Sequence, residues 1–342
     1  MTTRLKAAIA FAATLAIFAP PTPSVAGEKV TWDYAIYGRP RAITAGIEKL
    51  VEYVKEKSNG DFTINLHWGT LAQPREFLDG ISIGAFNGAY YAASFSPGKT
   101  PTSTVLDLPF LPITTFDQSV RVFDSFRTYQ PQIDEMKRWN AVSFMSMNIE
   151  SYEIMGKGTP PQSFLDLRGL RLRAIAGFGE MVKVLGGSPV TIVPPELYGA
   201  MERGLVDGAA FPLSNFGPYR LQDIAKWYTV GMPTTSGHSM TVFNLAGYEK
   251  LPPEYKKLLD EGRTAGYAAQ KEAYKIDLEK WVDEYKKAGL TEIRISAADR
   301  QAMVDRAAKP IWDAWIAEAT AKGVNARALL DFILAEARKA SS

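Results

Sequence analysis

Residues 164–213 read FLDLRGLRLRAIAGFGEMVKVLGGSPVTIVPPELYGAMERGLVDGAAFPL, and this segment decides the fold. Alternating apolar residues indicate strands, and apolar residues three or four apart indicate helices. Glycines follow each predicted helix, as expected of helix ends. The segment predicts strands at 169–174, 190–193 and 206–211, and helices at 178–185 and 196–203. Such regular alternation of strand and helix builds an α/β protein with parallel strands.

The same pattern extends toward the N-terminus. Residues 30–36 alternate as a strand, and a loop at 38–41 leads into a helix that ends at Asn59-Gly60. A second strand at 62–66 completes a β-α-β unit, and residues 141–147 predict one more strand. The apolar stripe of the helix consists of Ile43, Ile47, Leu50, Val51 and Val54.

The last third of the chain is helical. Residues 253–288 are nearly all helix-forming residues. Ser296 and Asp299 have the spacing of a capping box at the start of another helix. We expect these long helices to brace two α/β lobes rather than to form a third domain.

The first 26 residues have the pattern of an export signal. Arg4 and Lys6 precede an apolar run at 7–18, and Ser24-Val25-Ala26 is a small-residue cleavage site before Gly27. We therefore expect a signal peptide at 1–26 and a periplasmic mature protein. No later apolar run is long enough to span a membrane, so no membrane insertion is expected after cleavage.

The composition excludes several classes of function. Without Arg4 and Lys6, the 39 basic residues become 37, equal to the 37 acidic ones. A balanced chain has no electrostatic footprint for nucleic acid. The chain has no cysteine, which excludes disulfides, cysteine metal sites and thiol catalysis.

Motifs for catalysis or cofactors are also missing. His67 and His238 are the only histidines and have no neighbouring ligand pattern, so we expect no metal site. No Walker loop, nucleophile elbow or dinucleotide fingerprint occurs. We expect no cofactor and no enzymatic activity, although paired carboxylates brought together by the fold remain an alternative.

Segment 164–213 resembles the receptor proteins of tripartite ATP-independent periplasmic (TRAP) transporters, the DctP-type family. The matching elements are DLRGLRLR at 166–173, GGSPV at 186–190, ELYGAMERGLVDG at 196–208, and Pro212. Weaker matches lie at 54–60, 108–110 and 251–253. The resemblance covers nearly the whole chain after residue 26.

The resemblance implies a two-lobe, periplasmic-binding-protein-like α/β fold, with a ligand cleft between the lobes and long connecting helices. We expect lobe I to comprise residues 27–150 and about 241–281, and lobe II residues 151–240 and about 282–342. It also implies a function: the protein would capture a small organic carboxylate by hinge closure and deliver it to the membrane subunits of a TRAP transporter.

Arg173 is the principal candidate for binding the ligand. In the family, the arginine that ends the GLKIR-type strand binds the substrate carboxylate, and the matching position here is Arg173. The residues alone support the same choice, because open α/β sheets bind ligands at the carboxyl ends of their strands. A guanidinium also meets a carboxylate with two parallel hydrogen bonds. We expect Arg171, on the same strand face, to be solvated.

The remaining candidates are mostly aromatic. Phe211 stands where the family often has a polar residue, Tyr152 and Glu153 stand near a frequent second arginine, and Ala92-Ala93 replace an acidic position of sugar-acid binders. These departures predict an apolar or aromatic monocarboxylate. Arg39 or Arg41 of the first loop offers a second cation. The predicted ligand-binding residues are Arg173, Phe211, Tyr152, Tyr37, Tyr91, Phe178 and Arg39.

Two other functions remain open from the sequence. A periplasmic sensor subunit would use the same cleft to signal instead of to transport. A periplasmic enzyme acting on small organic acids would need acid–base groups beside Arg173.

Overall fold

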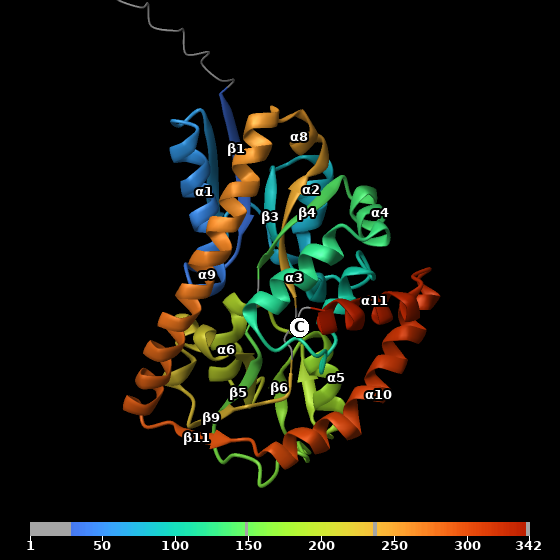
Figure 1. The fold of residues 1–342 in the computed structure, drawn as a ribbon. Coiled ribbons are helices and arrows are strands. Elements are labelled where there is room, and N and C mark those ends of the chain that lie inside the picture. The colour runs from blue at the N-terminus through green and yellow to red at the C-terminus, as the bar shows by residue number, and fades with distance from the viewer. Residues whose placement is uncertain (1–28, 148–149, 235–237, 340–342) are drawn as a thin grey trace, which may run out of the picture.

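The computed structural model describes residues 29–147, 150–234 and 238–339, which form two β-sheets covered by helices (Figure 1). The five-stranded sheet has the order β2 (Phe62–Trp68), β1 (Val30–Ile36), β3 (Gly88–Tyr91), β10 (Ser239–Asn244) and β4 (Ala141–Met147). Strands β1 and β2 are parallel, as the β-α-β pattern predicts. Strand β10, which the sequence did not reveal, runs antiparallel to both of its neighbours.

The second sheet has six strands. Its order is β11 (Thr291–Arg294), β9 (Trp227–Val230), β5 (Tyr152–Gly156), β8 (Gly208–Pro212), β6 (Arg171–Arg173) and β7 (Ser188–Val190). Strand β6 is parallel to β7 and β8, as expected, and β5 is antiparallel to β8. The predicted strand at 190–193 is wrong, because pairing with β6 ends at Val190 and the carbonyl of Ile192 accepts a side-chain bond from Arg173 instead.

Helix α1 (Ala45–Lys57) packs on the five-stranded sheet through the predicted stripe. Ile47, Leu50 and Val54 are fully buried. The helix ends at Lys57, and Asn59 and Gly60 just beyond it have positive φ angles of 53° and 84°. The other helices before residue 253 are α2 (Phe77–Ile83), α3 (Phe116–Arg127), α4 (Gln130–Arg138), α5 (Ala176–Val184), α6 (Leu197–Glu202), α7 (Leu213–Phe216) and α8 (Leu245–Lys250).

Seven short 3-10 helices complete the described connections. They are η1 (Ala42–Thr44), η2 (Pro74–Glu76), η3 (Ala93–Phe95), η4 (Ser103–Asp107), η5 (Pro194–Glu196), η6 (Gly217–Tyr219) and η7 (Leu221–Asp223).

Helix α9 (Pro253–Lys287) runs along both sheets (Figure 1). Near its start, the ring of Tyr255 packs on that of Phe62, with centroids 5.1 Å apart. Near its end, the hydroxyl of Tyr285 donates to the carbonyl of Leu213 at 2.6 Å and accepts from the amide of Gly217 at 2.9 Å. One helix thus joins the two halves of the molecule, as the helical last third predicts.

Helix α10 (Ala297–Ala321) begins at the predicted cap, where the Ser296 hydroxyl accepts from the Asp299 amide at 3.0 Å. It packs on α5 and also reaches the other half, since the indole of Trp315 donates to Thr104 at 2.9 Å. Helix α11 (Ala326–Lys339) lies against α3. Helix α11 thus packs on a helix from the N-terminal half of the chain, and the predicted division into lobes stays a prediction.

No helix in residues 29–147, 150–234 or 238–339 combines the length and apolarity that a membrane span requires.

Candidate functional site

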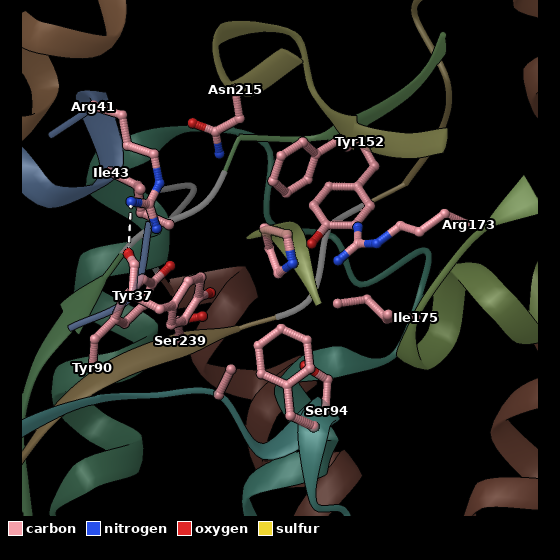
Figure 2. A pocket seen from close by; sticks show the side chains of 14 residues that line it. Tyr37, Arg41, Ile43, Tyr90, Ser94, Tyr152, Arg173, Ile175, Asn215 and Ser239 are labelled. Atoms are coloured by element: carbon pink, nitrogen blue, oxygen red, sulfur yellow. Dashed lines mark hydrogen bonds between the residues drawn. The ribbon is translucent and has the colours of Figure 1, made fainter. Parts of the chain in front are cut away.

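A narrow cavity lies between the two sheets (Figure 2). The space among its lining atoms amounts to about 360 Å3. The end of β1 and its loop contribute from one side, and β5, β6 and β8 contribute from the other. The lining residues are Tyr37, Arg41, Ile43, Tyr90, Ala92, Ser94, Phe95, Tyr152, Arg173, Ile175, Pro194, Phe211, Asn215 and Ser239.

Arg173 enters this cavity from the carboxyl end of β6 (Figure 2). Its side chain is fully buried, with 0% exposure. Nε donates to the carbonyl of Ile192 at 3.0 Å, and Nη1 donates to the carbonyl of Ala210 at 2.8 Å. Nη2 is buried and has no hydrogen-bond partner among the described residues. The neighbouring backbone thus fixes the guanidinium and leaves a donor unsatisfied at the cavity.

Arg171, two residues earlier on the same strand, has a different environment. Its side chain is 50% exposed and forms a bidentate pair with Asp207, with Nη2 2.7 Å from Oδ1 and Nε 3.1 Å from Oδ2. The structure therefore confirms the prediction of an exposed Arg171. The carboxylate of Asp207 already occupies the guanidinium of Arg171.

Arg41 approaches the cavity from the opposite side (Figure 2). It directly precedes η1, where the Arg41 amide donates to the Thr44 hydroxyl at 2.9 Å. Nη1 donates to the carbonyls of Tyr37 and Arg39, at 3.1 and 2.7 Å. The side chain of Arg39 itself does not line the cavity, because this turn directs Arg41 inward and leaves Arg39 exposed.

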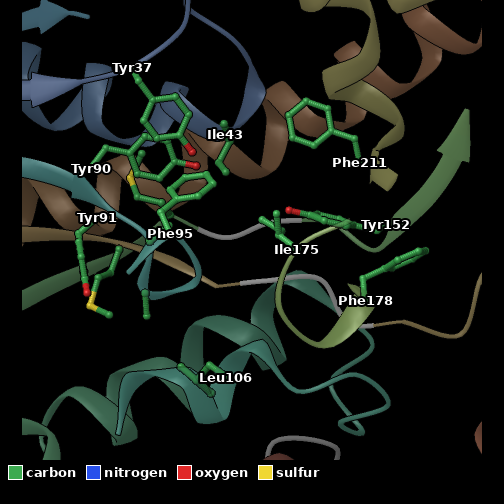
Figure 3. Close-up of a cluster of buried hydrophobic side chains, with 14 of the residues drawn as sticks. Tyr37, Ile43, Tyr90, Tyr91, Phe95, Leu106, Tyr152, Ile175, Phe178 and Phe211 are labelled. Carbon is green, nitrogen blue, oxygen red and sulfur yellow. The ribbon is translucent and has the colours of Figure 1, made fainter. Parts of the chain in front are cut away.

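Five aromatic residues line the cavity: Tyr37, Tyr90, Phe95, Tyr152 and Phe211 (Figure 3). Tyr37 and Tyr90 stack with centroids 4.8 Å apart and an interplanar angle of 8°. On the other side, the ring of Tyr152 lies 6.1 Å from that of Phe211. Burial raises the pKa of the Tyr152 hydroxyl to about 12, so this group stays neutral and can donate a hydrogen bond at physiological pH.

Two predicted aromatic residues lie outside the lining. Phe178 packs behind Tyr152 at 5.9 Å and supports that ring. Tyr91 points away from the cavity, and its hydroxyl lies 2.7 Å from the Thr100 hydroxyl (Figure 3). Side chains alternate along a strand, so β3 presents Tyr90 to the cavity and turns Tyr91 to the other face.

The structure adds polar residues that sequence reasoning missed. Asn215 lines the cavity from α7, and its Oδ1 is buried without a partner among the described residues. Ser94 and Ser239 also contribute. The family motif places its polar residue before the proline, where this chain has Phe211. The helix that starts directly after Pro212 brings in an amide three residues beyond it.

No acidic residue belongs to the described lining of the cavity. Glu153, adjacent to Tyr152, accepts hydrogen bonds from Thr229 at 2.7 Å and from the amide of Gly231 at 2.7 Å, so its carboxylate has a structural role. The described residues also contain no group of three or more metal-ligating side chains. The cavity therefore presents two guanidinium groups and neutral donors to whatever it binds.

His238 directly precedes β10 and does not belong to the cavity lining. Its ring packs on Phe123 at 4.9 Å, and its amide donates to Asp107. Burial lowers the pKa of the imidazole to about 3, which keeps it neutral at ordinary pH.

Residues 38–319 match the family model for bacterial extracellular solute-binding proteins, family 7. Among curated proteins, the chain is similar to the C4-dicarboxylate-binding periplasmic protein DctP of Rhodobacter capsulatus. The two are 23% identical over 285 residues, which cover 78% of this chain and 80% of that protein.

Solved structures with the same fold include TRAP solute-binding proteins. One, from a marine metagenome, is described as specific for aromatic acid ligands and was solved with 3-hydroxybenzoate. It has a TM-score of 0.82 and 20% sequence identity, and the match covers 92% of this chain and 100% of that chain. Another, from Rhodoferax ferrireducens, contains copurified benzoate; it has a TM-score of 0.81 and 20% identity, with coverages of 91% and 98%.

Proposed function

This chain belongs to the bacterial extracellular solute-binding proteins of family 7, the receptors of TRAP transporters, and from that premise we propose that it captures a small aromatic monocarboxylate in the periplasm. Members of this family are solute-binding components of transporters and not enzymes, which answers the enzyme alternative.

The observation that carries the proposal is the state of Arg173. A buried arginine has a high desolvation cost unless an anion or other acceptor compensates for it. Two carbonyls hold its guanidinium in place, Nη2 has no described partner, and no acidic side chain is present in the lining. A ligand carboxylate supplies the missing charge and accepts the unsatisfied hydrogen bond.

The shape and composition of the cavity favour an aromatic ligand over a sugar acid. The cavity is narrow, and Tyr37, Tyr90, Tyr152 and Phe211 form much of its wall. Rings of this kind stack on a flat apolar ligand, whereas the several hydroxyls of a sugar acid need more polar partners than these residues offer. The solved relatives described with aromatic acids share this fold and support the same ligand class.

The proposed mechanism is hinge closure. The ligand contacts Arg173 on the lobe of the six-stranded sheet and aromatic residues on the lobe of the five-stranded sheet. Because it touches both lobes only when they are together, it binds the closed form better than the open one. The closed form is then the one that the membrane subunits of the transporter recognise. A sensory role would use the same closure, and it differs from transport in the partner alone.

A binding screen tests this proposal. Purified mature protein is melted with benzoate-type acids, with succinate and malate, and with galacturonate and sialic acid. We expect the largest upward shifts with the aromatic acids, because a ligand at 100 times its Kd stabilises a protein by about 2.7 kcal/mol. Largest shifts with the dicarboxylates or the sugar acids would contradict the proposed ligand class.

Transport and sensing are separated in cells. Deleting the gene in its natural host should abolish uptake of the radiolabelled acid identified by the screen. Unchanged uptake combined with a lost transcriptional response to the acid would instead favour the sensor.

A further inference from the structure

Arg41 lies in the same cavity as Arg173 but has no role in the function proposed above. Its side chain is 7% exposed, which is exceptional for an arginine in a loop. It belongs to the loop after β1, whereas Arg173 belongs to β6 in the other sheet. The two guanidinium groups enter the cavity from opposite sides (Figure 2).

Tyrosine rings surround the guanidinium of Arg41. Its central carbon lies 5.3 Å from the ring centroid of Tyr37, 5.7 Å from that of Tyr90 and 5.9 Å from that of Tyr219. These distances are within the range of cation–π attraction. Tyr219 belongs to η6, beyond β8, so this arrangement joins residues from both lobes.

The hydrogen bonds of Arg41 are incomplete. Nη1 is saturated by the carbonyls of Tyr37 and Arg39, but Nε is buried without a partner among the described residues. No ion pair involves Arg41 in the part of the chain that the structure describes. A buried charged donor without an acceptor is costly, and a structural role alone would leave that cost uncompensated.

We propose that Arg41, within its tyrosine cage of Tyr37, Tyr90 and Tyr219, forms a second acceptor-binding subsite, so that the ligand is an aromatic carboxylate with another oxygen acceptor on its ring. Arg173 binds the carboxylate, and Arg41 binds a ring hydroxyl or a second carboxylate. This inference rests on the proposed function and specifies its ligand. The shared chemistry is an oxygen acceptor held opposite the first carboxylate, and two buried cations with no acidic lining favour such a ligand electrostatically.

The test compares five acids by calorimetry. They are benzoate, 3-hydroxybenzoate, 4-hydroxybenzoate, isophthalate and terephthalate. We expect the best ring-substituted acid to bind wild type at least tenfold more tightly than benzoate, since a hydrogen bond to a charged group is stronger than one between neutral groups. Whether the hydroxy acids or the diacids bind most tightly identifies which oxygen acceptor the subsite prefers.

Variants assign this preference to Arg41. In Arg41→Met, the ratio of the affinity for the best substituted acid to the affinity for benzoate should shrink to about threefold or less, whatever the change in benzoate affinity itself. Arg41→Lys keeps the charge without the fork and should retain part of the preference. Arg39→Met removes the same charge from an exposed position two residues away, and it should retain the wild-type preference in full.

Two results would overturn the inference alone: wild type that binds benzoate and the substituted acids equally, or Arg41→Met that weakens all acids by the same factor. The first of these needs no variant, so it applies even if Arg41→Met does not fold. If no acid binds, or if binding does not depend on Arg173, the proposed function fails as well, and the inference falls with it.

Discussion

Arg173 is held in position before any ligand arrives, because two backbone carbonyls accept from its Nε and Nη1. Removing one partner of a buried ion pair costs about 3–5 kcal/mol, since the other charge stays desolvated. Arg173→Ala should therefore weaken binding of the aromatic acid by roughly two to three powers of ten or more. Arg173→Lys keeps the charge but loses the fork, so its affinity should lie between those of alanine and wild type. Calorimetry measures all three proteins.

Arg171→Ala is the matched control for this series. Arg171 lies on the same strand as Arg173. Its substitution removes a half-exposed ion pair with Asp207, which contributes little free energy and does not contact the ligand. Its affinity should be close to that of wild type. Equal affinities for Arg173→Ala and wild type would show that another group holds the carboxylate.

Asp107 makes stability depend on pH. Burial raises the pKa of its carboxyl to about 7, and Oδ2 has no partner among the described residues. The unfolded chain has an ordinary pKa near 3.9. The folded protein therefore holds this proton more tightly, and the resulting stabilisation is lost as pH rises through about 7. The neighbouring His238 stays neutral over this range.

Asp107→Asn removes this titration and keeps an oxygen for the His238 amide. Between pH 5 and pH 8, the unfolding free energy of wild type should fall relative to that of the variant by on the order of 2–4 kcal/mol. Urea denaturation at several pH values measures the difference. Parallel pH profiles for the two proteins would contradict the assignment.

At the scale of elements, the first turn of α5 meets the segment after η4 without room for a side chain. A Cβ on Gly177 would lie 2.4 Å from the carbonyl oxygen of Asp107 and 2.3 Å from Cδ of Pro109. Overpacking of this kind costs about 1–3 kcal/mol. Gly177→Ala should therefore oppose closure and weaken ligand binding about 5- to 100-fold, while the free protein melts normally because alanine favours the helix.

Gly179→Ala is the comparison within the same helix. Its Cβ would meet nothing closer than 3.4 Å, so ligand affinity should stay near that of wild type. A Gly177→Ala protein that binds as tightly as Gly179→Ala would mean that this contact does not limit closure.

The crossing of α1 and α9 depends on a second close approach. A Cβ on Gly266 would lie 2.5 Å from the carbonyl oxygen of Gly46. Gly266→Ala should lower the unfolding free energy by about 1–3 kcal/mol in spite of the better helix propensity of alanine. Gly262→Ala, with nearest contacts of 3.4 Å, should be neutral or slightly stabilising. Denaturant melts compare the two, and equal stabilities would contradict the steric argument.

Local elements could be predicted from the sequence because each carries its own periodicity. The β-α-β unit from Val30 to Trp68 is an example, since its strands alternate and its helix ends just before Asn59-Gly60. Strand β10 escaped prediction because Met240 and Val242 alternate with polar residues over only four positions before Phe243 breaks the pattern, and all six residues are buried. Arg41 could not be distinguished from Arg39 because the direction of each side chain depends on the turn at η1.

At the scale of the whole molecule, α9 and α10 both contact each half, so we expect the lobes to unfold as one cooperative unit. Native-state hydrogen exchange tests this expectation. The most protected amides of β1 and β8 should exchange with the same opening free energy and the same denaturant dependence. A separate opening of β8 at lower free energy would show that the long helices do not couple the lobes.

The absence of acidic residues in the described cavity lining has a consequence for the ligand-free protein. Closing the lobes without a ligand buries the charges of Arg41 and Arg173 without an anion, and the effective desolvation penalty is several kcal/mol per ion. If closure without a ligand is unfavourable by about 3 kcal/mol, fewer than one ligand-free molecule in a hundred is in the closed form. We therefore expect the ligand-free protein to favour the open form, and a bound carboxylate to supply the counter-ion that closure requires. Ligand-free molecules are then expected to compete little with ligand-bound ones for the membrane subunits of the transporter.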